Sequence, residues 1–222
     1  MEEPLLYINI PGFEHYPHVT YTWVIIILLS VASFLVGRRL KLVPEGVGQN
    51  FFEVAVEGIA NFMDENIGHG GRRYLPLIGT IAFFILLSNL VGLIPGFLSP
   101  TANVNTNAAM AVVVFLTYHY IGITRHGIVK YLKSFTGPIW WLAPLIFPLE
   151  IITHLARPLT LTLRLFGNIK GEDLVLIILA SLVPLLLPVP MMFLAIFTSI
   201  IQTVIFSLLS MFYIAGALEE HH

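Results

Sequence analysis

The sequence contains no cysteine among its 222 residues. This absence excludes disulfide bridges, thiolate nucleophiles and thiolate metal sites. Charged residues are scarce as well, at 11% of the chain, whereas a soluble domain usually carries about a quarter. The formal net charge is −2. The chain therefore has no basic excess that would indicate nucleic acid as a partner.

The scarce charges leave long gaps between them. Residues without Asp, Glu, Lys or Arg number 23 between Glu14 and Arg38, 51 between Arg73 and Arg125, and 45 between Asp173 and Glu219. One membrane-crossing helix needs roughly 20 apolar residues. The first gap therefore holds one span, and each of the others about two. The sequence predicts an all-α polytopic membrane protein, a single transmembrane domain over residues 1–222.

The first predicted span covers residues 20–37. It is followed by three basic residues, Arg38, Arg39 and Lys41, whereas residues 1–19 carry only acidic charges. By the positive-inside rule the N-terminus is external and residue 40 is cytoplasmic. The acidic N-terminus has no signal-peptide or transit-peptide pattern, so we expect the first span itself to direct insertion.

Residues 50–66 have a different pattern. Six apolar residues recur at helical spacing and polar residues occupy the opposite face, which predicts an amphipathic helix. The apolar residues are Phe51, Phe52, Ala55, Ile59, Phe62 and Met63. Because basic residues flank this segment on both sides, we expect it to lie on the cytoplasmic membrane surface.

The rest of the chain predicts four more crossings, over residues 74–98, 108–123, 140–182 and 188–218. An uncharged, Asn-rich segment separates the first two, and basic residues mark the cytoplasmic side after the second. Prolines between residues 184 and 190 supply the turn between the last two. About five crossings place the C-terminus in the cytoplasm.

Residues 150–173 place charges inside an otherwise apolar stretch. A charge at the centre of a membrane helix costs on the order of 2.5–3.5 kcal/mol on insertion scales, so such residues indicate function. Six polar residues share one helical stripe: Glu150, Thr153, Arg157, Thr160, Arg164 and Asn168. For Arg157, two interpretations stand equally: a functional role, or a side chain that extends (snorkels) to a lipid headgroup. For Lys170, Glu172 and Asp173, we expect a wet loop or a hairpin end.

Arg164 has no carboxylate three or four residues away on its own helix. Its guanidinium is permanently charged, so it requires a partner elsewhere. That partner lies on another helix, in a water-filled cavity or in another subunit.

A longer motif encloses this arginine. Residues 148–168, Pro-Leu-Glu-Ile-Ile-Thr-His-Leu-Ala-Arg-Pro-Leu-Thr-Leu-Thr-Leu-Arg-Leu-Phe-Gly-Asn, closely resemble the signature of subunit a of the F-type ATP synthase. Residues 88–95, 100–105, 201–203 and 219–222 match the same family in order and spacing. The resemblance covers most of the chain.

The resemblance implies a membrane stator subunit without a catalytic site or cofactor of its own, and the absence of a transit-peptide pattern favours the bacterial plasma (inner) membrane. Its implied partners are a ring of c subunits, the b-subunit peripheral stalk, the F1 sector, protons and membrane lipid. Arg164 matches the essential arginine that faces the ring carboxylate. A fixed cation there favours release of the proton from an arriving carboxylate and blocks a leak between two aqueous half-channels. The last two helices are implied to form a long tilted hairpin.

Individual positions follow from the same resemblance. Asn168 and Gln202 match polar residues near the arginine, and Glu150 matches a carboxylate of the cytoplasmic half-channel. Asp173 occupies the position of the external half-channel acid, with Glu172 beside it. His154, four residues after Glu150, is the one histidine that we assign to the proton path.

At two positions the sequence differs from the family pattern, so the resemblance does not identify every residue of the external path. Ala195 stands where some relatives have a histidine, and Asn103 where the external loop often has aspartate. The path would then depend on Glu172, Asp173 and water.

Two other classes compete with this interpretation. A stand-alone secondary transporter or ion channel would tend to show internal repeats, and the arginine stripe has no second copy. An intramembrane metal oxidase would need clustered histidines. Only His119 and His126 share a helical register, and no HExxH motif is present.

Overall fold

The computed structural model describes residues 17–38, 47–67, 70–94, 96–135, 140–183, 186 and 188–218, and its regular elements there are all helices. The α-helices are α1 (Pro17–Arg38), α2 (Val47–Ile67), α3 (Leu75–Gly92), α4 (Val104–His126), α5 (Ile128–Ser134), α6 (Ala143–Leu182) and α7 (Pro188–Leu218). Short 3-10 helices precede α3, α4 and α6: η1 (Gly71–Tyr74), η2 (Pro100–Ala102) and η3 (Trp140–Leu142). The predicted all-α fold class is confirmed.

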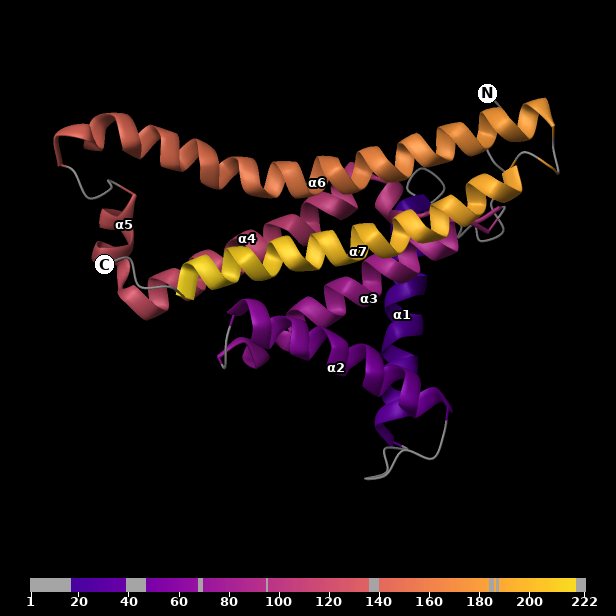
Figure 1. Ribbon diagram of the computed structural model, residues 1–222, viewed down its shortest axis with the longest axis horizontal. Helices are drawn as coiled ribbons and strands as arrows, with labels where there is room; N and C mark the ends of the chain where they lie inside the picture. The colour runs from indigo at the N-terminus through magenta and orange to yellow at the C-terminus, as the bar shows by residue number, and fades with distance from the viewer. Residues whose placement is uncertain are drawn as a thin grey trace.

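Helices α6 and α7 form an antiparallel pair along the length of the molecule, and α3 and α4 pack against it (Figure 1). Helix α1 stands steeply to this pair in the same view and contacts α3 and η2. Helix α2 lies at the edge, against α3 and α7. The long pair is therefore supported on one side by the rest of the chain.

Two apolar clusters hold the helices together. The first joins α3, α4, α6 and α7 through buried residues that include Ile85, Val114, Leu165 and Phe206. The second brings Met63 of α2 against α3, α4 and α7. Residues with less than a tenth of their surface exposed make up both clusters, and because lipid chains are as apolar as these side chains, the clusters stabilise the bundle mainly by van der Waals packing. The apolar face predicted for residues 50–66 thus packs partly on the bundle.

Four segments of the described chain are long and apolar enough to cross a membrane: Pro17–Arg38, Gly71–Gly92, Val104–His126 and Pro188–Leu218. Helix α6 has 40 residues, ample length for a crossing; its charged residues distinguish it from these four. The protein is a multi-pass membrane protein.

The ends of two helices differ from the sequence-based expectation of 74–98 and 108–123. Helix α3 ends at Gly92, because a residue that precedes a proline, here Ile94, is biased away from helical geometry. Helix α4 begins at Val104, because the side chain of Asn103 accepts a hydrogen bond from the Asn105 amide at 2.9 Å and caps the helix.

The expectation of a loop or hairpin end at Lys170, Glu172 and Asp173 is wrong. All three lie inside α6, which continues to Leu182. Neither Gly167 nor Gly171 interrupts the helix. The helix ends instead at the proline-containing segment before α7, which begins at Pro188, where the missing N–H costs no hydrogen bond.

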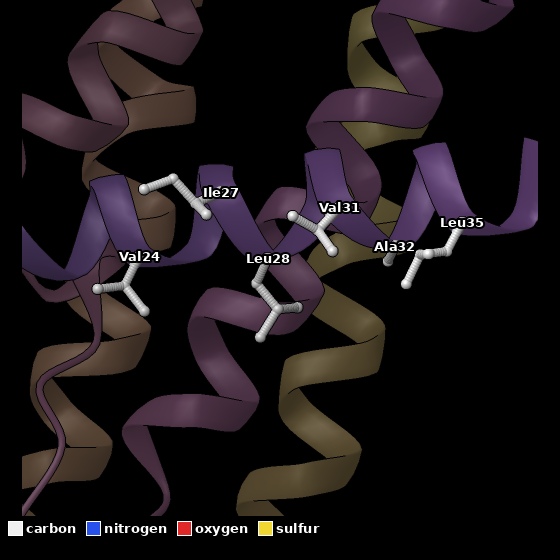
Figure 2. A pocket seen from close by; sticks show the side chains of 6 residues that line it. All are labelled: Val24, Ile27, Leu28, Val31, Ala32 and Leu35. Carbon is white, nitrogen blue, oxygen red and sulfur yellow. The ribbon is translucent and has the colours of Figure 1, made fainter.

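The outer side of α1 is apolar. Figure 2 shows a shallow hollow there, lined by Val24, Ile27, Leu28, Val31, Ala32 and Leu35. All six lining side chains lack polar atoms, so the hollow suits lipid chains or an apolar helix and offers nothing to a polar ligand.

The close approach of α3 to the turn at η2 gives a first prediction. A Cβ added at Gly92 would lie 2.5 Å from the Cβ of Ser99, whereas one at Gly79 on the same helix meets nothing within 4 Å. We expect Gly92→Ala to destabilise the folded chain by about 1–3 kcal/mol, the usual effect of overpacking. Thermal unfolding in detergent measures this, with Gly79→Ala as control. Equal melting temperatures for the two variants would contradict the packing described here.

Candidate functional site

Arg164 is exposed on α6 and forms no hydrogen bond or ion pair with any residue that the structure describes. Gly167, Asn168 and Gly171 are also exposed, and their spacing of three, four and seven residues places them on the same face as Arg164. A Cβ added at either glycine would meet nothing within 4 Å. We call these four residues the open face of α6. Another helix could approach it closely.

The open face narrows the choices for the partner of Arg164. No helix in the described part of the chain supplies a carboxylate to it. The remaining sources are water and another subunit. Isolated charge on a membrane helix is costly, so this position indicates an interface or a wet cavity rather than contact with lipid.

The amide of Asn168 is held by α7. Its Nδ2 donates a hydrogen bond to Oε1 of Gln202 at 2.7 Å. Gln202 is only 2% exposed, so the buried glutamine fixes the amide on the open face one turn from Arg164. The structure therefore brings these two sequence-predicted residues together across the α6–α7 pair.

A second group lies toward the start of α6. The His154 ring lies between two hydrogen-bonding partners: its Nε2 is 3.3 Å from Oε1 of Glu150, and its Nδ1 is 3.1 Å from the Tyr118 hydroxyl on α4. The Arg157 guanidinium lies over two rings, with Cζ 5.7 Å from the centroid of Tyr118 and 5.1 Å from that of Tyr213 on α7. We call these five residues the Tyr118 cluster. Arg157 therefore packs against aromatic rings of α4 and α7.

Aromatic side chains cover the Tyr118 cluster on its α5 side. The rings of His119 and Phe135 lie 5.3 and 4.7 Å from the His154 ring. Tyr131 of α5 packs edge-on against His119. Burial raises the pKa of the Tyr131 hydroxyl, so this group stays protonated at neutral pH. The cover limits water on this side of the cluster.

The two acidic residues of the sequence prediction lie beyond Arg164 in the other direction. Glu172 is 9% exposed and Asp173 is half-buried. They follow Arg164 by eight and nine residues, or roughly 12 Å along a helix. Within the described residues neither carboxylate has an ion pair. Ala195, the departure on α7, is fully buried and offers no polar group.

A buried polar cluster near η2 lies outside the candidate residues predicted from the sequence. Thr101 is at its centre: its Oγ1 is 2.6 Å from Oγ of Ser99 and donates to Oδ1 of Asn89 at 2.6 Å, and its carbonyl accepts from Asn107 at 2.8 Å. The Ser99 hydroxyl also donates to the Ser88 carbonyl at 2.9 Å. Four hydroxyl and amide side chains in an apolar bundle are a usable sequence signal, since buried polar groups need partners. Helix η2 packs against α6.

The described residues include no group of three or more His, Asp or Glu side chains that could hold a metal ion. His119, half-buried, places its Nδ1 2.9 Å from the Phe115 carbonyl, an ordinary contact within one helix. The Tyr118 cluster thus consists of proton donors and acceptors around an arginine.

Comparison with known proteins gives a consistent result. The family model described as "ATP synthase A chain" matches residues 19–215. The chain is 55% identical over 217 residues to "ATP synthase subunit a 1" of Syntrophotalea carbinolica. The matched region covers 96% of this chain and 92% of that protein. It is 53% identical to "ATP synthase subunit a" of Trichlorobacter lovleyi over the full length of both chains. It is also 55% identical to "ATP synthase subunit a" of Geobacter sulfurreducens, over 92% of this chain and 88% of that protein.

Proposed function

The chain belongs to the ATP synthase A chain family, and on that premise we propose that Arg164 faces the carboxylates of a rotating c-subunit ring. The family forms the proton-channel stator of the membrane sector Fo, so the chain is a component of the F-type ATP synthase. The observation that carries the proposal is the open face of α6. It presents a permanent cation and two glycines outward, with no described carboxylate beside them.

The chemistry of proton release follows from the cation. A ring carboxylate that arrives beside Arg164 is favoured in its ionised form and gives up its proton. It must bind a proton again before it turns into lipid, because an ionised group there is costly. Release and uptake on opposite sides of Arg164 then give rotation a direction.

The positions of the acids support two offset half-channels. Glu150 precedes Arg164 by 14 residues, roughly 21 Å along a helix, whereas Glu172 and Asp173 follow it by roughly 12 Å. We assign Glu150 and His154 to the cytoplasmic half-channel. We assign Glu172 and Asp173 to the external one, with water completing the path where Ala195 supplies no side chain. Asn168 and Gln202 lie between them beside the arginine.

The membrane and the topology belong to the same proposal. We place the chain in the bacterial inner membrane with its N-terminus outside and its C-terminus in the cytoplasm. Basic residues cluster after α1 and after α4, in agreement with cytoplasmic loops at both places. The b-subunit stalk and the F1 sector are the further expected partners.

Purification separates this function from a stand-alone transporter or channel. An affinity-tagged chain extracted in mild detergent is expected to copurify with ATPase activity and with a small two-helix subunit that carries a carboxylate in mid-membrane. A chain that reconstitutes proton or solute transport alone, without either partner, would contradict the proposal.

A further inference from the structure

A buried tyrosine outside the proposed proton path lies at the centre of the Tyr118 cluster. Tyr118 of α4 is 1% exposed. It contacts His154 and Arg157, both on α6, and its ring centroid is 6.0 Å from that of Tyr213 on α7. One side chain thus joins three helices at the point where the proposed cytoplasmic half-channel begins.

The hydrogen bonds fix the direction of the donors. A carboxylate oxygen accepts hydrogen bonds, so the 3.3 Å contact between Glu150 Oε1 and His154 Nε2 assigns the ring proton to Nε2. In a neutral imidazole the other nitrogen is then an acceptor. Nδ1 of His154 accordingly accepts from the Tyr118 hydroxyl. The hydrogen bonds therefore form a series from Tyr118 through His154 to Glu150, in which each donor points toward the carboxylate.

The aromatic ring of Tyr118 makes a cation–π contact with Arg157. Both centroid distances of Arg157, 5.7 Å to Tyr118 and 5.1 Å to Tyr213, lie within the cation–π range of roughly 6 Å. No described carboxylate lies within ion-pairing distance of Arg157. The two rings therefore hold Arg157 by cation–π contact, while Arg164, seven residues later, stays exposed.

We propose that Tyr118 is a positioning residue of the cytoplasmic half-channel, with one role for its hydroxyl and another for its ring. The hydroxyl holds His154 in the tautomer that donates to Glu150. The ring, together with that of Tyr213, holds Arg157 against α4 and α7 and leaves Arg164 as the arginine of the open face. This inference rests on the proposed function, because it concerns the residues of that half-channel.

Removing the hydroxyl alone tests the first role. Tyr118→Phe keeps the ring and the packing, so the complex is expected to assemble in normal amounts. Passive proton flux through vesicles stripped of F1 is expected to fall about three- to tenfold, the equivalent of one hydrogen bond. Tyr120→Phe is the matched control, since Tyr120 lies on the same helix but is 68% exposed, and wild-type flux is expected for it.

The mechanism is tested by combining variants. His154→Leu removes both ring nitrogens and with them the link between Tyr118 and Glu150. Because both changes break the same link, we expect Tyr118→Phe with His154→Leu to conduct no more slowly than His154→Leu alone. Additive effects would overturn the assignment of Tyr118 to this series of hydrogen bonds. Nitrogen NMR of ¹⁵N-histidine-labelled complex, with the His154 signals identified by their loss in His154→Leu, should show one tautomer in wild type and a mixture in Tyr118→Phe.

The ring has its own test. We expect Tyr118→Leu, which removes the ring as well as the hydroxyl, to lower flux further than Tyr118→Phe. Wild-type flux in Tyr118→Phe, measured beside an inactive Arg164→Ala, would overturn the inference and leave the proposed function standing. Normal pumping by Arg164→Ala would remove the proposed function and this inference together.

Discussion

Replacing Arg164 by alanine is expected to abolish ATP-driven proton pumping in inverted membrane vesicles while the complex still assembles. Assembly should persist because the side chain is exposed and forms no hydrogen bond or ion pair with a described residue. Without the cation, an ionised ring carboxylate has no counter-charge. A charge in mid-membrane costs roughly 2.5–3.5 kcal/mol, or about a hundredfold in rate.

The matched control is Arg125→Ala, which removes the same side chain from an exposed position in the last turn of α4. Its pumping is expected to equal that of wild type. Arg164→Lys keeps a positive charge but loses the planar, permanently charged group, and we expect it to recover little activity. Near-normal pumping by Arg164→Ala would contradict the role proposed for the open face.

Neutralising both acids beyond Arg164 is expected to have the second largest effect. In the double variant Glu172→Gln/Asp173→Asn we expect passive proton flux through F1-stripped vesicles to fall at least tenfold. These residues supply the only carboxylates of the described chain on that side of Arg164 along α6, and general acid–base groups contribute factors of about 10²–10⁴ to proton transfer elsewhere. Each single variant is expected to retain part of the flux, since the neighbouring acid can carry the proton.

A carboxylate outside the proposed path provides the control. Glu65→Gln removes an exposed charge from α2 and is expected to leave passive flux unchanged. Unchanged flux in the double variant would place the external path elsewhere, and the buried polar cluster around Thr101 would be the next region to test.

The sequence predicted the helical framework well where apolar length alone decides it. Helix α7 runs over Pro188–Leu218, the same residues as the predicted span, because prolines at one end and apolar residues throughout define it. The end of α3 was missed because Ile94 precedes a proline, a local rule that apolar length does not express. The polarity of Lys170, Glu172 and Asp173 favours a wet loop or a hairpin end, whereas the apolar residues around them keep all three in α6, inside the predicted span 140–182.

The site was predictable only in part. Arg164 could be identified from its cost and from the absence of a carboxylate on its own helix. Tyr118 could not, because Tyr118, His119 and Tyr120 are consecutive polar aromatics and sequence does not tell which of them faces α6. The tertiary register decides this: Tyr118 is 1% and Tyr120 is 68% exposed.

The central claim is that the open face of α6 contacts the c-subunit ring, and disulfide cross-linking tests it most directly. The chain has no cysteine, so each introduced one is unique. Leu163→Cys and Gly167→Cys place a thiol beside Arg164 at exposed positions, and Ile27→Cys places one on the outer side of α1. Each is combined with a cysteine one turn from the ring carboxylate. A disulfide forms only when the two Cβ atoms come within roughly 3.5–4.5 Å.

Mild oxidation is expected to join the ring subunit to the chain from Leu163→Cys or Gly167→Cys, and not from Ile27→Cys. Cross-links that form from Ile27→Cys as readily as from α6, or from neither α6 position, would contradict the assignment of Arg164 to the ring.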